Sequence, residues 1–228
     1  MRKRVTVIAG HYGSGKTNIA VNYALALAAE GKAVSVADLD IVNPYFRSKD
    51  SARVLSEKGI KLISSPYANS NVDTPALPAD AYSITDDKSR FAVVDVGGDD
   101  RGALALGRYA PAIVEENDYE MLLVINKFRP LTRDAASVME IKAEIEQSCG
   151  IAFTGIVNNS NLGAETTAAD VLGSVEYAEK VAAAANIPIR LTTIDEKIFY
   201  ELDGKIENLM PLCLYVQQSW QKQEDNNG

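Results

Sequence analysis

The sequence has few of the residues that hold metal clusters or cross-link small secreted folds. Its 228 residues include two cysteines and one histidine. Cys149 and Cys213 lie far apart and form no C-x-x-C pair, so we expect no zinc or iron–sulfur site built by one subunit alone. Both cysteines sit in apolar stretches, and we expect them to be buried free thiols in a reducing cytosol.

Long apolar runs and an excess of positive charge are also missing. No stretch approaches the ~20 apolar residues that a membrane-spanning helix needs. The short apolar run near the start leads directly into a glycine-rich loop, which is not typical of a signal peptide. The formal net charge is −8, which argues against non-specific binding to nucleic acid or to an anionic membrane. We therefore expect a cytoplasmic protein with neither nucleic acid nor membrane among its partners.

One strong motif stands near the start of the chain. Residues 10–17, GHYGSGKT, fit the pattern G-x-x-x-x-G-K-[ST] of a phosphate-binding P-loop. A β-branched apolar run at 4–9 predicts a strand before the motif, and 17–30 predict a helix after it. This context distinguishes the motif from a glycine-rich turn that fits by chance.

The P-loop residue types predict how a phosphate chain would be held. Glycines let the backbone wrap closely around phosphates, and the loop N–H groups and helix N-terminus supply partial positive charge. The lysine is expected to reach the β- and γ-phosphates, and the threonine hydroxyl to bind Mg²⁺. The expected phosphate-binding residues are Gly10, Gly13, Ser14, Gly15, Lys16 and Thr17.

Carboxylates follow two further predicted strands. Asp38 and Asp40 follow the strand at 32–37, and Asp95 ends another apolar strand and precedes two glycines. Ligands of open α/β sheets bind at the carboxyl ends of strands. We expect Asp38 and Asp95 to hold Mg²⁺ through water, and Asp40 to orient or deprotonate the attacking water. The Gly97 N–H is placed to sense a γ-phosphate. A solvated polar turn is the alternative for the first two aspartates.

Residues in and after three later predicted strands indicate which nucleotide base is bound and what contacts it. The strand at 119–126 runs into N-K-F-R, which resembles the guanine-reading motif N-K-x-D but carries Arg129 in place of the aspartate, so GTP is disfavoured. The strand at 151–157 ends in Asn158, whose carboxamide is expected to meet the adenine edge. Pro188, in a short strand, is expected to face the base.

Strand and helix signals alternate throughout, which predicts an α/β fold with a mostly parallel twisted sheet and helices on both faces. We expect one P-loop nucleotide-binding domain at 1–216 and a polar, disordered tail at 217–228. The loop at 64–78 is either a lid or partner surface, or a plain polar connection. Further helices are expected at 50–58, at 102–114 with Pro111 inside, at 131–149 with Thr132 as N-cap, and at 166–185.

These motifs together resemble the MinD/ParA-like branch of P-loop ATPases, which have a CobQ/CobB/MinD/ParA nucleotide-binding domain. The resemblance extends from Val5 to about Leu191 and rests on the P-loop, the aspartates at 38, 40 and 95, the glycines at 97 and 98, and Asn158. It implies ATP with Mg²⁺, slow hydrolysis, and a nucleotide-dependent homodimer whose affinity for a protein partner changes. Asp40 matches the family's water-activating aspartate.

One residue departs from the family pattern. The family has a lysine after the first P-loop glycine that reaches across the dimer, and this chain has His11 there. A neutral histidine supplies no fixed cation. Hydrolysis is then slow, or a protonated His11 or Arg47 substitutes, or His11 is an ordinary loop residue. Neither a basic membrane-targeting helix nor a DNA-binding basic patch is evident.

Three functions are compatible with this pattern. The first is a switch ATPase that uses Lys16 and Asp40 in catalysis and acts on an unidentified protein partner. The second is a small-molecule enzyme of the dethiobiotin synthetase or cobyrinic acid amidase type, in which ATP phosphorylates a carboxylate. The third is a nucleotide-binding adaptor with little hydrolysis.

Overall fold

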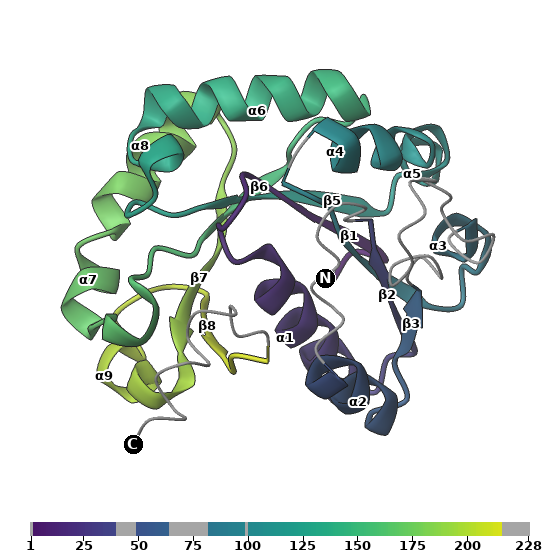
Figure 1. The fold of residues 1–228 in the computed structure, drawn as a ribbon, viewed down its shortest axis with the longest axis horizontal. Helices are drawn as coiled ribbons and strands as arrows, with labels where there is room; N and C mark the ends of the chain where they lie inside the picture. Colours follow the sequence, from purple (N-terminus) through teal and green to yellow (C-terminus); the bar gives the residue numbers. More distant parts are fainter. Residues whose placement is uncertain (1, 40–48, 64–81, 99, 216–228) are drawn as a thin grey trace.

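The computed structural model of the chain describes residues 2–39, 49–63, 82–98 and 100–215. Within these ranges eight strands form one sheet of order β3-β2-β4-β1-β5-β6-β7-β8, in which every neighbouring pair is parallel (Figure 1). The strands are β1 (Val5–Ala9), β2 (Val34–Asp38), β3 (Lys61–Ile63), β4 (Phe91–Asp95), β5 (Tyr119–Ile125), β6 (Gly155–Asn158), β7 (Ile189–Asp195) and β8 (Leu209–Leu212).

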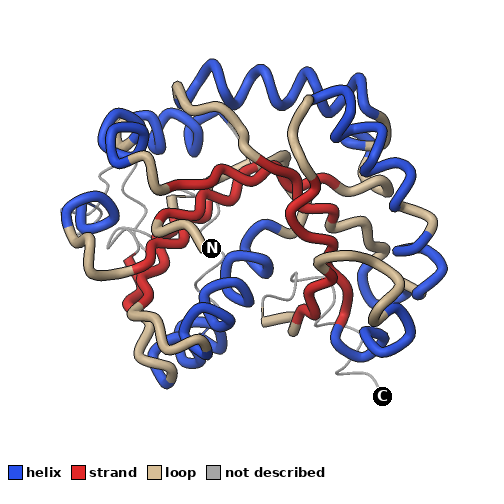
Figure 2. Tube along the Cα trace, turned by 180° about the vertical axis from the view of Figure 1, so that it is seen from behind, coloured by secondary structure: helices blue, strands red, loops and turns tan. Residues whose placement is uncertain are grey.

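Helices cover both faces of this twisted sheet, which Figure 2 shows from behind. One apolar layer packs beneath α1 and α2, and the other packs beneath α4, α5, α6 and α8. The predicted fold class is thereby confirmed. The helices are α1 (Lys16–Ala29), α2 (Lys49–Glu57), α3 (Ser83–Asp86), α4 (Asp100–Gly107), α5 (Ala110–Glu116), α6 (Ala135–Cys149), α7 (Ala168–Leu172), α8 (Val175–Ala185) and α9 (Phe199–Leu202).

Strand alternation sends neighbouring side chains into different layers. Val7 of β1 packs in the layer with α4 and α6, whereas Ile8 packs against α1. All five residues of β1, β2 and the last four of β4 are buried, as expected of central parallel strands. The central strand β1 therefore holds the loop that follows it at the middle of the sheet's carboxyl edge.

Two long helices of the sequence prediction are each divided in two. Pro111 lies in the first turn of α5, where its fixed φ and missing N–H are tolerated, so the helix expected at 102–114 ends at α4 and restarts. Gly173 and Ser174 separate α7 from α8 within the stretch 166–185. A glycine lowers helix propensity, and the buried serine hydroxyl donates to the Val171 carbonyl, which closes the end of α7.

The start of α6 also differs from the prediction. Asp134 is the N-cap, and its carboxylate accepts a 2.9 Å hydrogen bond from the Ser137 N–H. Thr132 instead ends a short 3-10 turn and donates its hydroxyl to the Asn126 carbonyl at 2.7 Å. Aspartate competes well with threonine for the cap position, because both accept from the N3 backbone amide.

The two cysteines are free thiols, but only the first is fully buried. Cys149 ends α6 inside the core, whereas Cys213 is half-buried and donates to Glu196. The expectation of burial was therefore wrong for Cys213. No helix within the described ranges is long and apolar enough to cross a membrane.

Candidate functional site

The P-loop connects β1 to α1 at the carboxyl edge of the sheet. Gly15 caps α1 with φ 92°, and a Cβ added there would lie 2.2 Å from the Asn159 side-chain nitrogen. Gly10 has φ 152°, and its Cβ would lie 2.6 Å from the Val124 carbonyl oxygen of β5. Both positions therefore exclude any side chain, for conformational and steric reasons together. The first N–H groups of α1 point into the loop, which makes it an anion site.

Lys16 lies inside this loop. Only 7% of the residue is exposed, and its Nζ donates to the His11 carbonyl at 3.0 Å. The ammonium thus lies where the loop curls around a phosphate chain. Ser14 is buried beside it, with 2% exposure.

Three oxygen-bearing side chains meet beneath the P-loop. Thr17 donates its hydroxyl to Oδ2 of Asp95 at 2.7 Å. Asp38 is the register partner of Asp95 across β2 and β4, and the two residues are 7% and 2% exposed. The Leu39 N–H donates to the Asp95 carbonyl at 2.9 Å and so extends the pairing of β2 with β4 by one residue. A hydroxyl and two carboxylates are hard oxygen donors of the kind that Mg²⁺ takes.

The segment after β4 packs against the P-loop. A Cβ on Gly98 would lie 2.5 Å from the Tyr12 nitrogen and 3.0 Å from Nζ of Lys16. Gly97 is contacted in turn by Gly102 of α4, whose Cβ would lie 2.6 Å from the Gly97 nitrogen. Close backbone contacts therefore connect the P-loop at Tyr12, through Gly98 and Gly97, to α4.

The structure gives Asn158 a different place from the one expected. The side chain is fully buried, donates to the Ser174 hydroxyl at 2.9 Å and accepts from the Ser160 hydroxyl at 2.7 Å. Both ends of its carboxamide are thus hydrogen-bonded inside the protein. The reason is alternation: Ile156, two residues earlier, packs in the layer that contains α8, and Asn158 shares its side of β6.

Asn159 is the asparagine that contacts the P-loop, and the sequence analysis missed it. Its Nδ2 donates to the Ser14 carbonyl at 2.6 Å, and its Oδ1 accepts from the Thr193 hydroxyl at 2.6 Å. Val157 packs in the α1 layer, so Asn159 continues the face of β6 that meets the P-loop. The signal in the sequence is strand alternation: Asn159 lies two positions after Val157 and therefore on the same face of β6.

Pro188 lies at the wrong edge of the sheet for its expected role. It precedes β7, which begins at Ile189 and runs to Asp195. Since the strands are parallel, residues before β7 lie at the amino edge, opposite the P-loop. The seven residues of β7 separate the two edges by roughly 20 Å at ~3.3 Å per residue. Pro188 is the second residue of the strand expected at 187–191, so it lies near the amino edge in that strand too. Its expected contact with the base therefore conflicts with the direction of the strand.

A pocket of about 340 Å³ adjoins the P-loop on the β6–β8 side. We call it the P-loop pocket. Arg129 lies in its wall, in the N-K-F-R stretch, whereas the Lys127 ammonium turns away to the Gly173 carbonyl at 3.0 Å. The other polar and apolar wall residues include Asn18, Phe128, Asn159, Asn161, Leu162, Thr166, Thr193 and Asp195.

A second hollow, of about 560 Å³, lies on the opposite side of the P-loop. We call it the α4–α6 groove. Its lining residues are His11, Gly98, Ala103, Leu131, Ser137, Glu140, Ile141, Glu144, Ile145 and Ser148. The His11 ring nitrogen Nδ1 lies 3.0 Å from the Tyr12 carbonyl oxygen, and Leu131 is 54% exposed.

Several predicted features fall outside the described residues. These are Asp40, Arg47, the loop at 64–78 and the tail at 217–228. Their predicted roles stay predictions.

Comparisons with known proteins agree with this geometry. The model of the CobQ/CobB/MinD/ParA nucleotide binding domain matches residues 5–187. Cytosolic Fe-S cluster assembly factor cfd1 of Emericella nidulans is 30% identical over 96 residues, which are 42% of this chain and 27% of that protein. Chloroplast FtsY of Physcomitrella patens aligns with a TM-score of 0.59 at 19% identity, over 87% of this chain and 60% of that one. Cell division protein ftsY of Thermotoga maritima aligns with a TM-score of 0.54 at 22% identity, over 92% of this chain and 65% of that one. The chain thus spans only part of each, and the two FtsY likenesses show the fold alone.

Proposed function

The chain belongs to the CobQ/CobB/MinD/ParA nucleotide-binding domain family, and from that premise we propose that it is a Mg·ATP-dependent switch ATPase that forms a homodimer on nucleotide binding and acts on a protein partner. The observation that carries the proposal is the meeting of Thr17, Asp95 and Asp38 beneath the P-loop lysine. Nucleotide binding by a P-loop of this type follows from the family; the nucleotide, the metal, hydrolysis and the dimer are the proposed parts.

Each site residue has a role in this proposal. Lys16 and the loop N–H groups bind the β- and γ-phosphates and offset their charge. Thr17 would hold Mg²⁺ directly, and Asp38 and Asp95 would hold it through water. The metal, when bound, neutralises charge on the phosphate oxygens. Asp40, two residues after Asp38 in the sequence, is assigned the role of orienting or deprotonating the attacking water, because it matches the water-activating aspartate of the family.

The switch would act through Gly98. Its contact with Tyr12 joins the P-loop to the segment that leads into α4. A change around the γ-phosphate displaces this segment and, with it, one wall of the α4–α6 groove. The groove combines an exposed Leu131 with the carboxylates of Glu140 and Glu144. These features suit a protein partner that presents apolar and basic side chains.

Arg129 supports ATP over GTP. A guanidinium only donates hydrogen bonds, so Arg129 cannot accept from the N1–H and N2–H groups of guanine, as the aspartate of N-K-x-D would. At the corresponding edge, adenine presents N1 as an acceptor. We expect tighter binding of ATP than of GTP, and we expect Arg129→Asp to reverse the preference. Equilibrium titration with the two fluorescent nucleotide analogues measures this ratio, and an unchanged ratio in the variant would remove Arg129 from base selection.

The carboxylate-activating enzyme is less well supported. A carboxylate substrate beside the γ-phosphate requires cations in the adjoining groove. In the described part of the chain, the groove's ionisable lining side chains are His11, Glu140 and Glu144. Two carboxylates next to the P-loop would repel such a substrate.

The test combines ATP turnover with light scattering, with Mg²⁺ or with EDTA. We expect wild type to hydrolyse ATP slowly and to dimerise with Mg·ATP. Asp40→Ala should keep binding and the dimer but lose turnover, and Lys16→Ala should lose tight binding. Asp203→Ala, at an exposed turn, is the matched aspartate control and should behave as wild type.

Each contrary outcome has a distinct meaning. Wild-type turnover in Asp40→Ala would refute the role of that carboxylate. A monomer under every condition would refute the dimeric switch. Turnover that requires an added carboxylate would establish the small-molecule enzyme, and tight binding without any turnover would establish the adaptor.

A further inference from the structure

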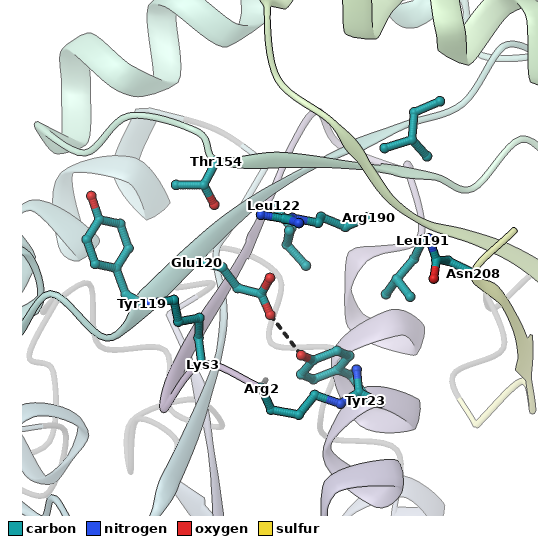
Figure 3. A pocket seen from close by; sticks show the side chains of 11 residues that line it. Arg2, Lys3, Tyr23, Tyr119, Glu120, Leu122, Thr154, Arg190, Leu191 and Asn208 are labelled. Carbon is teal, nitrogen blue, oxygen red and sulfur yellow. Dashed lines mark hydrogen bonds between the residues drawn. The ribbon is translucent and has the colours of Figure 1, made fainter.

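A separate pocket of about 680 Å³ opens at the amino edge of the sheet, opposite the P-loop (Figure 3). Its walls come from the starts of β5 and β7 and from Tyr23 of α1. Leu122 and Leu191 form its apolar surface and belong to the layer beneath α1. We call it the amino-edge pocket. Its volume lies in the range of small-molecule sites, roughly 300–1,000 Å³.

The charge of this pocket is opposite to that of the chain. Arg2, Lys3 and Arg190 line it, against the one carboxylate of Glu120. The whole chain has a net charge of −8. Three cations that gather from two distant segments of an acidic protein make a local anion-attracting region.

Two of these cations form only weak internal pairs. Arg2 pairs with Glu30 at 3.0 Å and Lys3 with Asp118 at 3.5 Å, and all four side chains are more than 40% exposed. Exposed pairs of this kind contribute little and exchange partners easily. Arg190 forms no ion pair with any residue that the structure describes. Its guanidinium is therefore available to a ligand.

Arg190 extends over the pocket through space that the absence of a side chain at Gly155 leaves open. A Cβ on Gly155 would lie 2.4 Å from Cγ of Arg190 and 3.3 Å from a methyl carbon of Leu122. Glycine at this position of β6 therefore lets the arginine stem cross the strand. Figure 3 shows the guanidinium lying above Leu122 and pointing into the pocket. A planar cation on an apolar base is well prepared to bind a carboxylate or phosphate in two-point geometry.

The wall opposite Arg190 is also fixed. Tyr23 donates its hydroxyl to Glu120 at 2.8 Å, and Thr6 donates to the same carboxylate oxygen at 3.3 Å. The Arg2 guanidinium lies 5.2 Å from the centre of the Tyr23 ring. Burial raises the pKa of Tyr23 to about 12, so the hydroxyl keeps its proton and this arrangement persists at neutral pH.

We propose that the amino-edge pocket binds a small organic anion, with its carboxylate or phosphate on Arg190 and its apolar body on Leu122 and Leu191. Arg2 and Lys3 add attraction at the entrance, and Glu120 excludes ligands that carry a second negative charge on the Tyr23 side. The site is independent of the nucleotide function, because it lies at the other edge of the sheet and shares no residue with the P-loop pocket.

The probe is anilinonaphthalene sulfonate, an anion with an aromatic body, titrated by fluorescence in the presence of saturating nucleotide. Arg190→Gln should weaken binding at least tenfold. Glu120→Gln should strengthen it several-fold, because the pocket then loses its negative charge while an amide oxygen still accepts from Tyr23. Arg133→Gln, an exposed arginine outside the pocket, is the control and should bind as wild type.

Competition identifies the ligand class. Benzoate and phenyl phosphate should displace the probe, and neutral benzyl alcohol should not; the stronger of the two anions distinguishes a carboxylate site from a phosphate site. Unchanged affinity in both Arg190→Gln and Glu120→Gln, or equal displacement by benzyl alcohol, would overturn the proposal. If circular dichroism shows that Arg190→Gln is unfolded, Arg190→Lys and Glu120→Gln decide, since they must still shift the affinity in opposite directions.

Discussion

Replacing Gly98 by alanine tests whether the P-loop and the segment after β4 act as one unit. The added methyl carbon would lie 2.5 Å from the backbone nitrogen and 2.6 Å from the Cα of Tyr12. Ordinary contacts between such atoms are about 3.5–4 Å. Both neighbours are backbone atoms of the P-loop, so no flexible side chain can move aside. One of the two segments has to shift by about 1 Å.

The size of the effect follows from this overlap. Overpacking by one methyl group in a tight contact costs about 1–3 kcal/mol. The displaced Tyr12 atoms belong to the phosphate-binding loop, and the added carbon itself would lie 3.0 Å from Nζ of Lys16. If the loop gives way, nucleotide affinity falls by about tenfold for every ~1.4 kcal/mol. We therefore expect Gly98→Ala to bind nucleotide about 10- to 100-fold more weakly than wild type.

Fluorescent-nucleotide titration measures the affinity, and urea unfolding measures the stability. Gly107→Ala is the matched control, because its added carbon would lie 3.5 Å or more from its neighbours. The control should bind nucleotide as wild type does and should be at least as stable, because alanine fits this helical position without strain. Wild-type affinity and stability in Gly98→Ala would refute the close contact and with it the proposed route from the P-loop to α4.

Three further predictions concern single side chains. Asn159→Ala leaves a P-loop carbonyl without its donor, so urea unfolding should show a loss of about 1–3 kcal/mol together with weaker nucleotide binding; Asn158→Ala should lower stability and leave affinity unchanged. Thr17→Val keeps the side-chain shape but removes the hydroxyl, so nucleotide titrations with Mg²⁺ and with EDTA should converge in the variant. Hydrogen bonds from Arg4 lower the pKa of Glu116 below its usual 4.5, so their ion pair stabilises the fold above that pH and loses its effect as pH falls through the lowered pKa. Glu116→Gln should cost about 3 kcal/mol at neutral pH, and urea midpoints of the variant and wild type should converge in acid; a constant difference would contradict the linkage.

The arrangement of strands and helices was largely predictable because buried parallel strands and amphipathic helices have different periods. The P-loop between β1 and α1, and the carboxylates that end β2 and β4, follow from the sequence in this way. Helix ends were less predictable. From the sequence alone, Pro111 could kink one long helix or begin a second one. The packing of α4 and α5 on the sheet decides between these two alternatives.

The candidate site was predictable only where its residues are local. The spacing within residues 10–17 specifies the loop, but strand register decided the rest. Asn159, one position after the predicted Asn158, is the residue that contacts the P-loop, and Pro188 precedes β7, at the edge opposite the loop. Neighbouring residues of a strand point to opposite faces, so the choice between Asn158 and Asn159 depends on which face of β6 meets the P-loop, and that is decided by the packing of the sheet.

Three contacts position the P-loop, and they come from β5, from the end of β6 and from the segment after β4. The first two restrain the loop, whereas the third lets it move. Gly10 lies against Val124 of β5, and Asn159 at the end of β6 donates to the Ser14 carbonyl, 145 residues away in sequence. Both contacts join the loop to the sheet itself. The third partner, Gly98, lies beyond the end of β4, where strand pairing has stopped. A segment that follows a strand moves more easily than the strand does. A change at the phosphates should therefore displace the Gly98 side of the loop, toward α4 and the α4–α6 groove, while the contacts with β5 and β6 keep the rest of the loop in place.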